Sequence, residues 1–573
     1  MIRAAPLERR RGVVIEQLAR ELEGVKAALA EAMRTIASLE ARSASLESAL
    51  VNTAAERDVL ARRLYGPKTE RQQTSELQLT LGGLLEEQKR LQRELDALRP
   101  KLGEGDADGD GGEGDGARDD DERPRPKPKG RRDLRASSLP VTTVELLDAE
   151  LERTGRRIGF EEARQLMYVR GGFRVLVRRV AKYEVELHGE PRALCQPSPP
   201  SLFPKALAHG SLIAHLAVQK FVLDVPHHRY EQFVMTAGHE RLDRATMGRY
   251  MEQLGNTLGA TVVTAMLDDA RTTCAVLSTD ATGALIQPGK KDGPMKRGCK
   301  KGHFFTIVAD ARHVLFVYAE RHSSDFVAKL FAGFRGFLQC DASSVYDILE
   351  RGPPSADTES AIQLVGCWAH CRRYFFEAAV TGSPIGVEGL TYIQNIYHAD
   401  KPLAELAPAA RKAKRGELVA PLMQAFFTWV DLRREEPRPR SLASRALGYA
   451  HNQEVELRRV LLDGRLPLDN TRSERQNRVP VVGRKNWLFY GSDLHAESAA
   501  AILSVVASCR MHRVDPEEYL ENLIRLLPYW PADRYLELAP VHWLATRARL
   551  DPEELAAHAG PFTVPPPKEP PAA

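Results

Sequence analysis

The stretch Leu466–Ser492 reads LPLDNTRSERQNRVPVVGRKNWLFYGS. Its centre sets a single carboxylate, Glu474, among Arg472, Arg475 and Arg478. At 3.6 residues per turn, Arg478 lies one turn beyond Glu474 on the same helix face. Such an acid belongs either to a surface helix with ion pairs or to a metal site surrounded by phosphate contacts. The second interpretation requires two further carboxylates upstream.

The ends of this helix are also marked in the sequence. Asp469 or Asn470 can cap its start, because both side chains accept hydrogen bonds from a first helical turn. Pro480 is expected to stop the helix soon afterwards, because proline disfavours a helical conformation at the residue before it.

An α/β pattern upstream supplies the two other carboxylates. Its expected elements are strands over 274–277, 303–309, 314–319, 336–340 and 361–365, and an amphipathic helix over 324–334. Three hairpin-like strands, a helix, a strand, a helix and a strand favour a mixed sheet of the ribonuclease H type. The first run ends at Asp280 and the fourth at Asp341, and such a sheet brings these two strand ends together.

Three carboxylates on this architecture suit phosphodiester chemistry, which uses two divalent cations. Asp280, Asp341 and Glu474 are therefore the candidate catalytic and metal-ligating residues. Their hard oxygen atoms select Mg²⁺ or Mn²⁺ over zinc. The helical, Ala-, Arg- and Leu-rich region 368–466 separates Asp341 from Glu474, and we expect it to be an inserted domain.

Two groups of basic residues are candidates for binding DNA phosphates. The first, in a loop next to the strand of Asp280, contains Lys290, Lys291, Lys296, Arg297, Lys300 and Lys301. The second, around Glu474, contains Arg472, Arg475, Arg478, Arg484 and Lys485. The alternative for the loop is a solvated hairpin.

The N-terminal region carries a heptad repeat over residues 14–64. One seam reads Ile15, Leu22, Leu29, Ile36, Ser43, Leu50, Arg57 and Leu64, and the other reads Leu18, Val25, Ala32, Leu39, Leu46, Thr53 and Leu60. This pattern predicts a self-associating coiled coil about 75 Å long. The alternative is a long helix packed on its own protein. A second helical pattern follows over 76–98.

The regions between the heptads and the sheet have weaker signals. Residues 103–122 alternate Gly with acids and 123–135 are basic and Pro-rich, so we expect a disordered linker that can add phosphate contacts. Strand-like runs at 165–169 and 173–177 indicate a small unit. Helices expected over 230–237 and 244–254 would suit a helix-turn-helix with Arg244, Arg249 and Tyr250 on its second helix, although many helical hairpins look the same. The Pro-rich end from Pro561 is expected to be mobile.

Composition restricts the protein class less than these patterns do. The formal net charge of +4 over 573 residues is small. The seven cysteines contain no CxxC pair, which indicates reduced thiols in a cytoplasm rather than a disulfide framework. No run of 18 apolar residues and no signal pattern occurs, so we expect that the chain does not span a membrane and is not secreted.

Several motifs closely resemble those of one family. The run LDNTRSERQNRVPVVGRKNWLFYGSDLHAESAA is very similar to the C-terminal signature of transposases of the insertion sequence 66 family. FAGFRGFLQCD, GCWAHCRRYFF, FPKALAHGSLIAHLAVQKF and a zipper ahead of YGPKTER are also similar to that family. The resemblance spans about residues 14–525.

This resemblance implies a DDE transposase whose catalytic acids match Asp280, Asp341 and Glu474. It implies Mg²⁺-dependent cleavage and strand transfer at the ends of an insertion sequence, in the cytoplasm at the bacterial nucleoid. The implied partners are terminal-repeat and target DNA, further copies of the chain through the coiled coil, and helper proteins of the same element.

The chain departs from the family at a small zinc module. The family's two cysteine pairs would fall near Asp148 and Leu151 and near Val185 and His188, where no cysteine occurs. We therefore expect no structural zinc. Cys367, His370 and Cys371 on one helix cannot all face one ion while a fourth ligand is missing, so they are interpreted as packing residues.

Together these observations predict an α/β ribonuclease-H-like catalytic core with a helical insertion, preceded by a coiled coil, a degenerate zinc-finger-like unit and a helical DNA-binding region. The expected boundaries are 1–100 for the leucine-zipper coiled coil, 101–136 for the linker, 137–200 for the zinc-finger-like unit, 201–270 for the helical region, 271–367 for the first part of the core, 368–466 for the insertion, 467–525 for the second part of the core and 526–573 for the tail. One alternative is a catalytically weak relative that binds DNA as a multimer. Another is a structural coiled-coil protein with an unrelated α/β domain, which leaves the basic residues around Glu474 unexplained.

Overall fold

The computed structural model describes residues 22–24, 26–47, 49–50, 53, 90–94, 134–187, 190–195, 198–238, 240–288, 298–351 and 362–567. Its contacts divide the chain into two units. The larger unit comprises Pro126–His370, Asn395–Ala425 and Asn452–Ala573, and the smaller comprises Met1–Arg125, Cys371–Gln394 and Phe426–His451. Most of the linker expected over 101–136, most of the second helical pattern over 76–98, and Lys290, Lys291, Lys296 and Arg297 lie outside the described residues.

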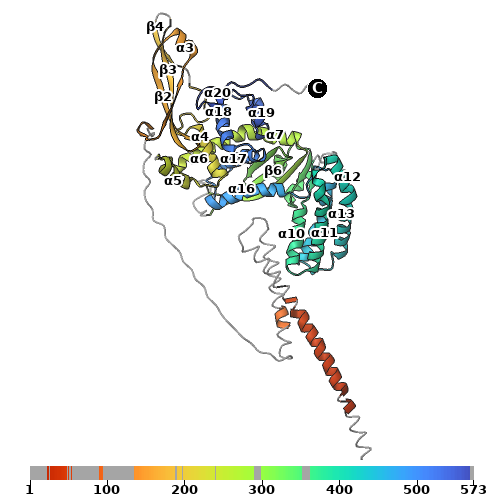
Figure 1. Ribbon diagram of the computed structural model, residues 1–573. Helices are drawn as coiled ribbons and strands as arrows, with labels where there is room; N and C mark the ends of the chain where they lie inside the picture. Colours follow the sequence, from red (N-terminus) through yellow and green to blue (C-terminus); the bar gives the residue numbers. More distant parts are fainter. Residues whose placement is uncertain are drawn as a thin grey trace, which may run out of the picture. The chain divides into compact units, whose positions relative to one another are not determined.

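The larger unit contains a mixed five-stranded sheet (Figure 1). Its strands are β5 (Val276–Ile286), β6 (Lys300–Ala309), β7 (His313–Ala319), β8 (Gly336–Gln339) and β9 (Ile362–Val365). They lie in the order β7-β6-β5-β8-β9, with β6 antiparallel to both neighbours and β5, β8 and β9 mutually parallel. The expectation of five strands in these places is confirmed.

The first strand is longer than its apolar run predicts. It was expected to end at Asp280, but β5 continues to Ile286, which pairs with Lys300 at the start of β6. Pairing with β6 continues the strand past the partly buried Ala281–Gly283, and Ala284 and Ile286 are buried again. The segment from Ser278 to Gly283 interrupts the apolar run, so the run marks only the start of the strand. Asp280 is therefore in the middle of a strand rather than at its end.

The edge strand β7 is covered by the Ala-rich helix α17 (Asp493–Met511). The N–H groups of Val314 and Phe316 donate to the hydroxyls of Ser508 and Ser504, at 3.0 and 2.8 Å. These bonds satisfy backbone donors that an open sheet edge leaves exposed. On its other side α17 packs against α6 (Arg244–Leu258), where a Cβ on Gly255 would lie 2.2 Å from the carbonyl oxygen of Ser498.

The helix expected over 324–334 is shorter in the structure. This helix, α8, covers Ser324–Leu330, and it is followed by Gly333 with φ of 84°. The left-handed conformation at Gly333 turns the chain toward β8 and ends the helical pattern. The buried side chains of Phe331 and Phe334 continue the apolar periodicity beyond the helix.

The region before the sheet is helical, as expected, with α4 (Gly210–Phe221), α5 (His227–Gly238), α6, the π-helical segment Gly259–Val263 and α7 (Thr264–Thr273). Tyr250 on α6 is buried, and its hydroxyl accepts from the N–H groups of Leu207 and Ala208 at 3.2 and 3.4 Å. Tyr250 thus lies on the second of the two helices, as predicted, where it is a packing residue. Arg244 and Arg249 are exposed on the same helix.

A four-stranded sheet precedes this helical region and contains β1 (Val141–Leu146), β2 (Arg156–Val169), β3 (Gly172–Leu187) and β4 (Glu190–Cys195). β2 and β3 form a long hairpin that contains both predicted strand-like runs. At a position of the family's cysteines, the Asp148 carboxylate accepts from the N–H groups of Glu150 and Leu151, at 2.9 and 3.0 Å, and caps α3 (Ala149–Thr154). The carboxylate thus holds this turn. His188 lies outside the described residues.

The region 368–466 is helical, as expected. It contains α10 (Trp368–Val380), α11 (Pro384–Asp400), α12 (Pro408–Leu418), α13 (Ala420–Arg433), α14 (Leu442–Asn452) and α15 (Glu454–Arg458). Within the larger unit, the fully buried Arg415 donates to Asp400 Oδ1 at 2.6 Å and to the carbonyl of Leu466 at 2.8 Å. This guanidinium fixes the chain directly before the stretch that contains Glu474. Within the smaller unit, Trp429 donates to Glu388 at 2.9 Å.

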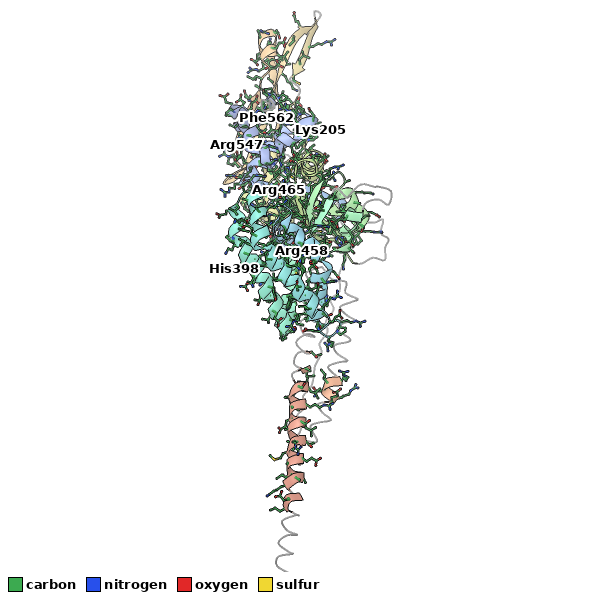
Figure 2. The ribbon with its side chains drawn as sticks, turned by 90° about the vertical axis from the view of Figure 1, so that its right-hand side faces the viewer. Lys205, His398, Arg458, Arg465, Arg547 and Phe562 are labelled. Atoms are coloured by element: carbon green, nitrogen blue, oxygen red, sulfur yellow. The ribbon has the colours of Figure 1, made fainter. Side chains whose placement is uncertain are left out.

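The C-terminal region contains α18 (Pro516–Leu526), α19 (Pro540–Arg547) and α20 (Pro552–Ala556). The segment after α20 was expected to be mobile from Pro561, but it packs on the protein as far as it is described. Phe562, labelled in Figure 2, is buried, and the Arg525 guanidinium lies 4.6 Å from the centre of its ring. Arg534 donates to the Pro565 carbonyl at 2.9 Å. A buried aromatic side chain and a cation outweigh the Pro-rich composition here.

The described part of the heptad region is helical over residues 22–24, 26–47 and 49–50. Three residues of one seam, Leu22, Leu29 and Ile36, are 56, 59 and 50% exposed. None of the helices in the described part of the chain has the length and apolarity needed to cross a membrane.

Candidate catalytic site

The helix that carries Glu474 is α16 (Thr471–Trp487), and it runs through Pro480. The expectation that Pro480 ends it is wrong. A proline inside a helix costs about 3 kcal/mol, but Ser473, Asn477, Pro480 and Gly483 form one buried stripe that packs on the sheet. The ring of Trp487 folds back onto Gly483, and the Lys220 ammonium lies 4.4 Å from the centre of the Trp487 ring. Tertiary packing therefore keeps the last two turns helical.

The start of α16 is fixed by buried hydrogen bonds to the sheet. The Asn470 side chain donates to the Thr279 carbonyl at 3.4 Å and accepts from the Cys367 thiol at 3.0 Å. Asn470 therefore attaches the start of α16 to the middle of β5 and to the segment that follows β9. The first-turn N–H of Thr471 is instead accepted by Asp469, at 3.1 Å.

The segment before α16 is fixed in the same way. Gln339, the last residue of β8, is fully buried and donates to the Pro467 carbonyl at 2.9 Å. The Trp368 N–H donates to the Leu468 carbonyl at 3.1 Å. The end of the sheet and the start of α10 thus determine where α16 begins.

The far end of α16 returns to β5. Arg484 donates to the Gly283 carbonyl, and Leu488, with φ of 66°, ends the helix. Beyond it, Tyr490 donates its N–H to the Leu285 carbonyl at 2.8 Å. Because α16 contacts Thr279 at its start and Leu285 after its end, it lies along β5 in the same direction.

Three residues stand in register just beyond the paired positions of β5, β8 and β9. The last paired positions are Ser278 with Gln339 between β5 and β8, and Gln339 with Val365 between β8 and β9. Asp280, Asp341 and Cys367 each lie two residues beyond them. The shared register predicts that these side chains leave neighbouring strands at the same edge and on the same face.

The carboxylate of Asp280 is buried and oriented. Its Oδ2 accepts from Asn477 Nδ2 at 2.6 Å, and its Oδ1 accepts from the N–H of Ala281 at 3.0 Å. The side-chain oxygen of Asn477 accepts from the hydroxyl of Thr306, which pairs with Asp280 across β5 and β6. Asn477 therefore connects α16, β5 and β6 at this carboxylate.

Asp341 follows β8 and is partly buried. It lines a pocket of about 290 Å³, and three further acids, Asp347, Glu350 and Glu456, also line that pocket. Glu350 is paired with Arg459 and accepts from the Leu364 N–H at 2.8 Å. The pocket beside Asp341 is thus acidic, which favours cations over anions.

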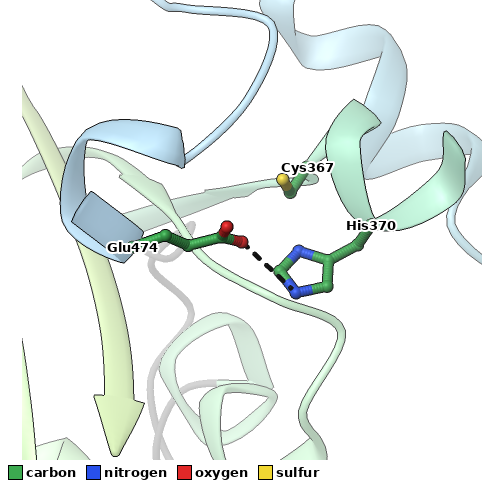
Figure 3. A group of neighbouring side chains, drawn as sticks. All are labelled: Cys367, His370 and Glu474. Atoms are coloured by element: carbon green, nitrogen blue, oxygen red, sulfur yellow. Dashed lines mark ion pairs between the residues drawn. The ribbon is translucent and has the colours of Figure 1, made fainter. Parts of the chain in front are cut away.

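Glu474 meets His370 and Cys367 rather than standing on an open surface (Figure 3). Its Oε1 is 3.5 Å from His370 Nε2, and its side chain is 24% exposed. The possible ligand atoms of Cys367, His370 and Glu474 all lie within 4.8 Å of one another. Among the described residues, the oxygen atoms of Asp280, Asp341 and Glu474 do not form such a group.

The cysteines near this edge are protonated at neutral pH. Burial raises the pKa of the Cys367 thiol to about 12, and burial also raises the pKa of Cys340 well above its usual value. A buried thiol with this pKa donates a hydrogen bond, as Cys367 does to Asn470.

The basic candidates differ in their surroundings. Lys300 forms an ion pair with Asp493 at 2.6 Å, and Arg484 donates to Gly283. The exposed candidates within the described part of the chain are Lys301, Arg472, Arg475, Arg478 and Lys485. The arginines 472, 475 and 478 lie at spacings of three along α16, opposite its buried stripe.

Two residues that hold this site were not identified as site residues from the sequence. Asn470 and Asn477 flank Glu474 at i−4 and i+3, a spacing that places all three on one helix face and could have indicated them. His370 was interpreted as a packing residue with Cys367 and Cys371. Nothing in the sequence brings Glu474 to Cys367 and His370, because more than 100 residues separate Glu474 from them.

Comparisons with known proteins support a single family. A model of the Transposase IS66 family matches residues 205–498, and a model of the IS66 C-terminal element matches residues 504–541. The uncharacterised protein y4qI of Sinorhizobium fredii (strain NBRC 101917 / NGR234) is 27% identical over 393 residues, which cover 67% of this chain and 71% of that protein. The uncharacterised protein y4hP of the same strain is 26% identical over 369 residues, covering 61% of this chain and 64% of y4hP.

Proposed function

Because the chain belongs to the IS66 family of transposases, we propose that it is a DDE transposase that cuts and joins DNA strands at the ends of its insertion sequence. Asp280, Asp341 and Glu474 are the proposed catalytic acids. The observation that carries this proposal is the placement of Asp280 and Asp341 two residues beyond the paired positions of adjacent parallel strands, with the Glu474 helix laid along the first strand.

The strand order supports a ribonuclease-H-like core for this proposal. Three antiparallel strands are followed by two strands parallel to the first, in the order β7-β6-β5-β8-β9. The helical region between β9 and α16 then corresponds to an insertion ahead of the third acid. This arrangement allows residues nearly 200 positions apart to act at one sheet edge.

DDE transposases typically use divalent metal ions, and the residues present fit such ions. Asp280, Asp341 and Glu474 offer carboxylate oxygens, which Mg²⁺ and Mn²⁺ prefer. Asp280 is held by hydrogen bonds from Asn477 and Ala281. When bound, divalent cations activate the attacking oxygen and stabilise the leaving oxygen in phosphodiester chemistry.

The exposed arginines of α16 support DNA binding beside these acids. Arg472, Arg475 and Arg478 form a row on the outer face of the helix that carries Glu474. A phosphate backbone bound along this row lies within a helix diameter of the acids, at roughly 10 Å. The loop that contains Lys290, Lys291, Lys296, Arg297 and Lys301 is proposed to extend the contact.

Self-association through the heptad region is also part of the proposal. The seam residues Leu22, Leu29 and Ile36 are large, apolar and exposed, and a second copy of the helix would bury them. Light scattering on the full chain and on a variant with these three residues changed to Lys would compare the two masses. A lower mass for the variant is expected.

The function is tested by strand cleavage. Purified full-length protein is mixed with a labelled duplex that contains an end of the insertion sequence, with Mg²⁺, with Mn²⁺ or with a chelator. We expect nicks at the 3′ ends that require the divalent cation and that are absent with Asp280→Asn. Specific DNA binding without cleavage in either metal would instead identify a catalytically weak, multimeric DNA-binding relative.

A further inference from the structure

The elements around Glu474 carry two sets of side chains with different chemistry. Asp280 on β5 and Asp341 after β8, the proposed partner acids, offer oxygen atoms only. Toward α10 lie Cys367 and His370, which offer sulfur and nitrogen, and in the described part of the chain only this second set closes to within 4.8 Å around Glu474 (Figure 3).

A set of one sulfur, one nitrogen and one oxygen donor suits a transition metal. Zinc binds cysteine sulfur at about 2.3 Å and histidine nitrogen or carboxylate oxygen at about 2.0–2.2 Å, so tetrahedral ligand atoms lie about 3.3–3.8 Å apart. Atoms that already lie within 4.8 Å of one another need to approach by at most about 1–1.5 Å. Mg²⁺ prefers oxygen ligands and is therefore not expected to bind Cys367 or His370.

The three residues come from elements that are held together. Cys367 follows β9, His370 lies in the first turn of α10, and Glu474 lies in the first turn of α16. Asn470 joins these elements, because its side chain accepts from Cys367 and its backbone N–H donates to the same sulfur at 3.4 Å. The cluster is therefore preorganised by backbone elements rather than assembled from surface loops.

We propose that Cys367, His370 and Glu474 form a binding site for Zn²⁺, with a fourth position left for water. We further propose that Zn²⁺ bound there withholds Glu474 from Asp280 and Asp341 and so switches off strand cleavage. The second statement rests on the proposed function, whereas the first does not.

Binding is balanced by loss of a proton. The Cys367 thiol gives its proton to solvent, the sulfur–hydrogen bond is replaced by a sulfur–zinc bond, and no oxidation occurs. The Asn470 side-chain oxygen then loses the thiol as a donor, while the Asn470 N–H continues to donate to the sulfur. Zinc affinity is therefore expected to rise with pH.

The site is tested with Co²⁺, which binds zinc sites and absorbs light. Full-length wild type, Cys367→Ser, His370→Gln and the control Cys299→Ser, an exposed cysteine, are titrated with Co²⁺ under reducing conditions. Wild type and Cys299→Ser are expected to develop a thiolate-to-cobalt charge-transfer band that Zn²⁺ abolishes. The band is expected to be absent with Cys367→Ser, and affinity is expected to fall by roughly 10–100-fold with His370→Gln.

Two spectroscopic results would overturn the site: no charge-transfer band in wild type, or an unchanged band in Cys367→Ser. Circular dichroism of each variant excludes loss of folding as the cause. Serine is close to cysteine in size and can keep the hydrogen bond to Asn470, so the Cys367→Ser variant tests the donor atom rather than the packing.

The regulatory statement is tested by cleavage in Mg²⁺, measured as the ratio of the rate with Zn²⁺ to the rate without it. A ratio below about one tenth is expected for wild type and Cys299→Ser, and a ratio near one for Cys367→Ser. If the metal binds but the wild-type ratio of cleavage rates is unchanged, the proposed regulation is overturned and the proposed binding site is kept. If wild type cleaves no DNA in Mg²⁺, the proposed function and the regulation both fail, and the cobalt spectrum still decides the site.

Discussion

The aspartates and the glutamate of the proposed triad are held by different kinds of structure. Asp280 lies in a strand that is hydrogen-bonded to β6. Asp341 lies two residues after β8, next to Cys340, whose N–H donates to the Val365 carbonyl at 3.1 Å. Glu474 lies one turn into a helix, where Asn470 fixes the backbone and His370 contacts the side chain. Strand pairing therefore holds the backbone at or next to the aspartates, whereas Glu474 is held by contacts of a helix start and of its own side chain.

The largest effect is expected when the charge of the glutamate or of one aspartate is removed. Glu474→Gln and Asp280→Asn are each expected to lower Mg²⁺-dependent cleavage by roughly 10³-fold or more, because each removes a carboxylate proposed to bind the cations. The double variant is expected to be little worse than either single one, because residues that act as a unit are not additive. Rates on an end-containing oligonucleotide measure this, and Glu405→Gln, at an exposed position, serves as the control.

Binding of the same oligonucleotide distinguishes Glu474 as a catalytic acid from Glu474 as an ion-pair residue. DNA affinity is expected to be kept or improved in Glu474→Gln, because a negative charge near phosphates is removed. If Glu474 were only an ion-pair residue, its loss would cost about 0–1 kcal/mol of stability and leave cleavage intact. Full activity in Glu474→Gln would remove it as the third acid.

A smaller effect is expected where the helix and the sheet are joined. Asn477→Ala removes the hydrogen bonds to Asp280 and Thr306 and leaves buried partners unsatisfied, which costs about 1–3 kcal/mol. Cleavage is expected to fall by roughly 10–100-fold because the Asp280 carboxylate loses its orienting donor. Urea denaturation and cleavage rates measure the two effects.

The matched control is Asn486→Ala, at an exposed position in the last turn of α16. It is expected to change stability by less than about 0.5 kcal/mol. Equal losses of stability in the two variants would mean that Asn477 contributes only helix propensity and that the joint between α16 and β5 lies elsewhere.

The salt dependence of DNA affinity compares the basic residues on the outer face of α16 with Lys300 on β6. Replacing Arg472, Arg475 and Arg478 by Ala is expected to reduce the slope of log affinity against log salt by about 2.7, at about 0.9 per phosphate contact. Lys300→Ala is expected to change the slope by much less, because Asp493 already pairs with this ammonium. Equal change per residue in the two variants would show that the ion pair opens when DNA binds.

The smallest expected effect concerns thiol reactivity. Cys299 is exposed, whereas burial raises the pKa of Cys367 to about 12. Iodoacetamide at about pH 8 is expected to modify Cys299 well before Cys367, because the thiolate is the reactive form. Mass spectrometry of the peptides gives the order, and equally rapid labelling of Cys367 would show that the end of β9 opens in solution.

The same pKa shift sets the sign of a stability effect. A buried thiol favours the protonated form in the folded state, and its pKa in the unfolded chain is about 8.5. Its contribution to stability is therefore fully present below about pH 8.5 and is lost as pH rises toward the folded pKa of about 12.

Much of the sheet was predictable because its signals are local. The runs of apolar residues gave five strands in their correct places, and the spacing of Asp280 and Asp341 behind them gave two candidate acids. The extent of β5 was not predictable, because Ser278 to Gly283 interrupt its apolar run, and pairing with β6 continues the strand beyond them. The position of the third acid on a helix was predictable, but its neighbours were not.

The sequence by itself determined the family, the order of the strands and the placement of Glu474 on a helix, because motifs and hydrophobic periodicity depend on residues close in the chain. Only the tertiary structure decided that α16 continues through Pro480, that Asn477 orients Asp280, and that Glu474 meets His370 and Cys367. These contacts join residues from 100 to nearly 200 positions apart. Their free energies arise from burial and packing against the sheet, which no local pattern encodes.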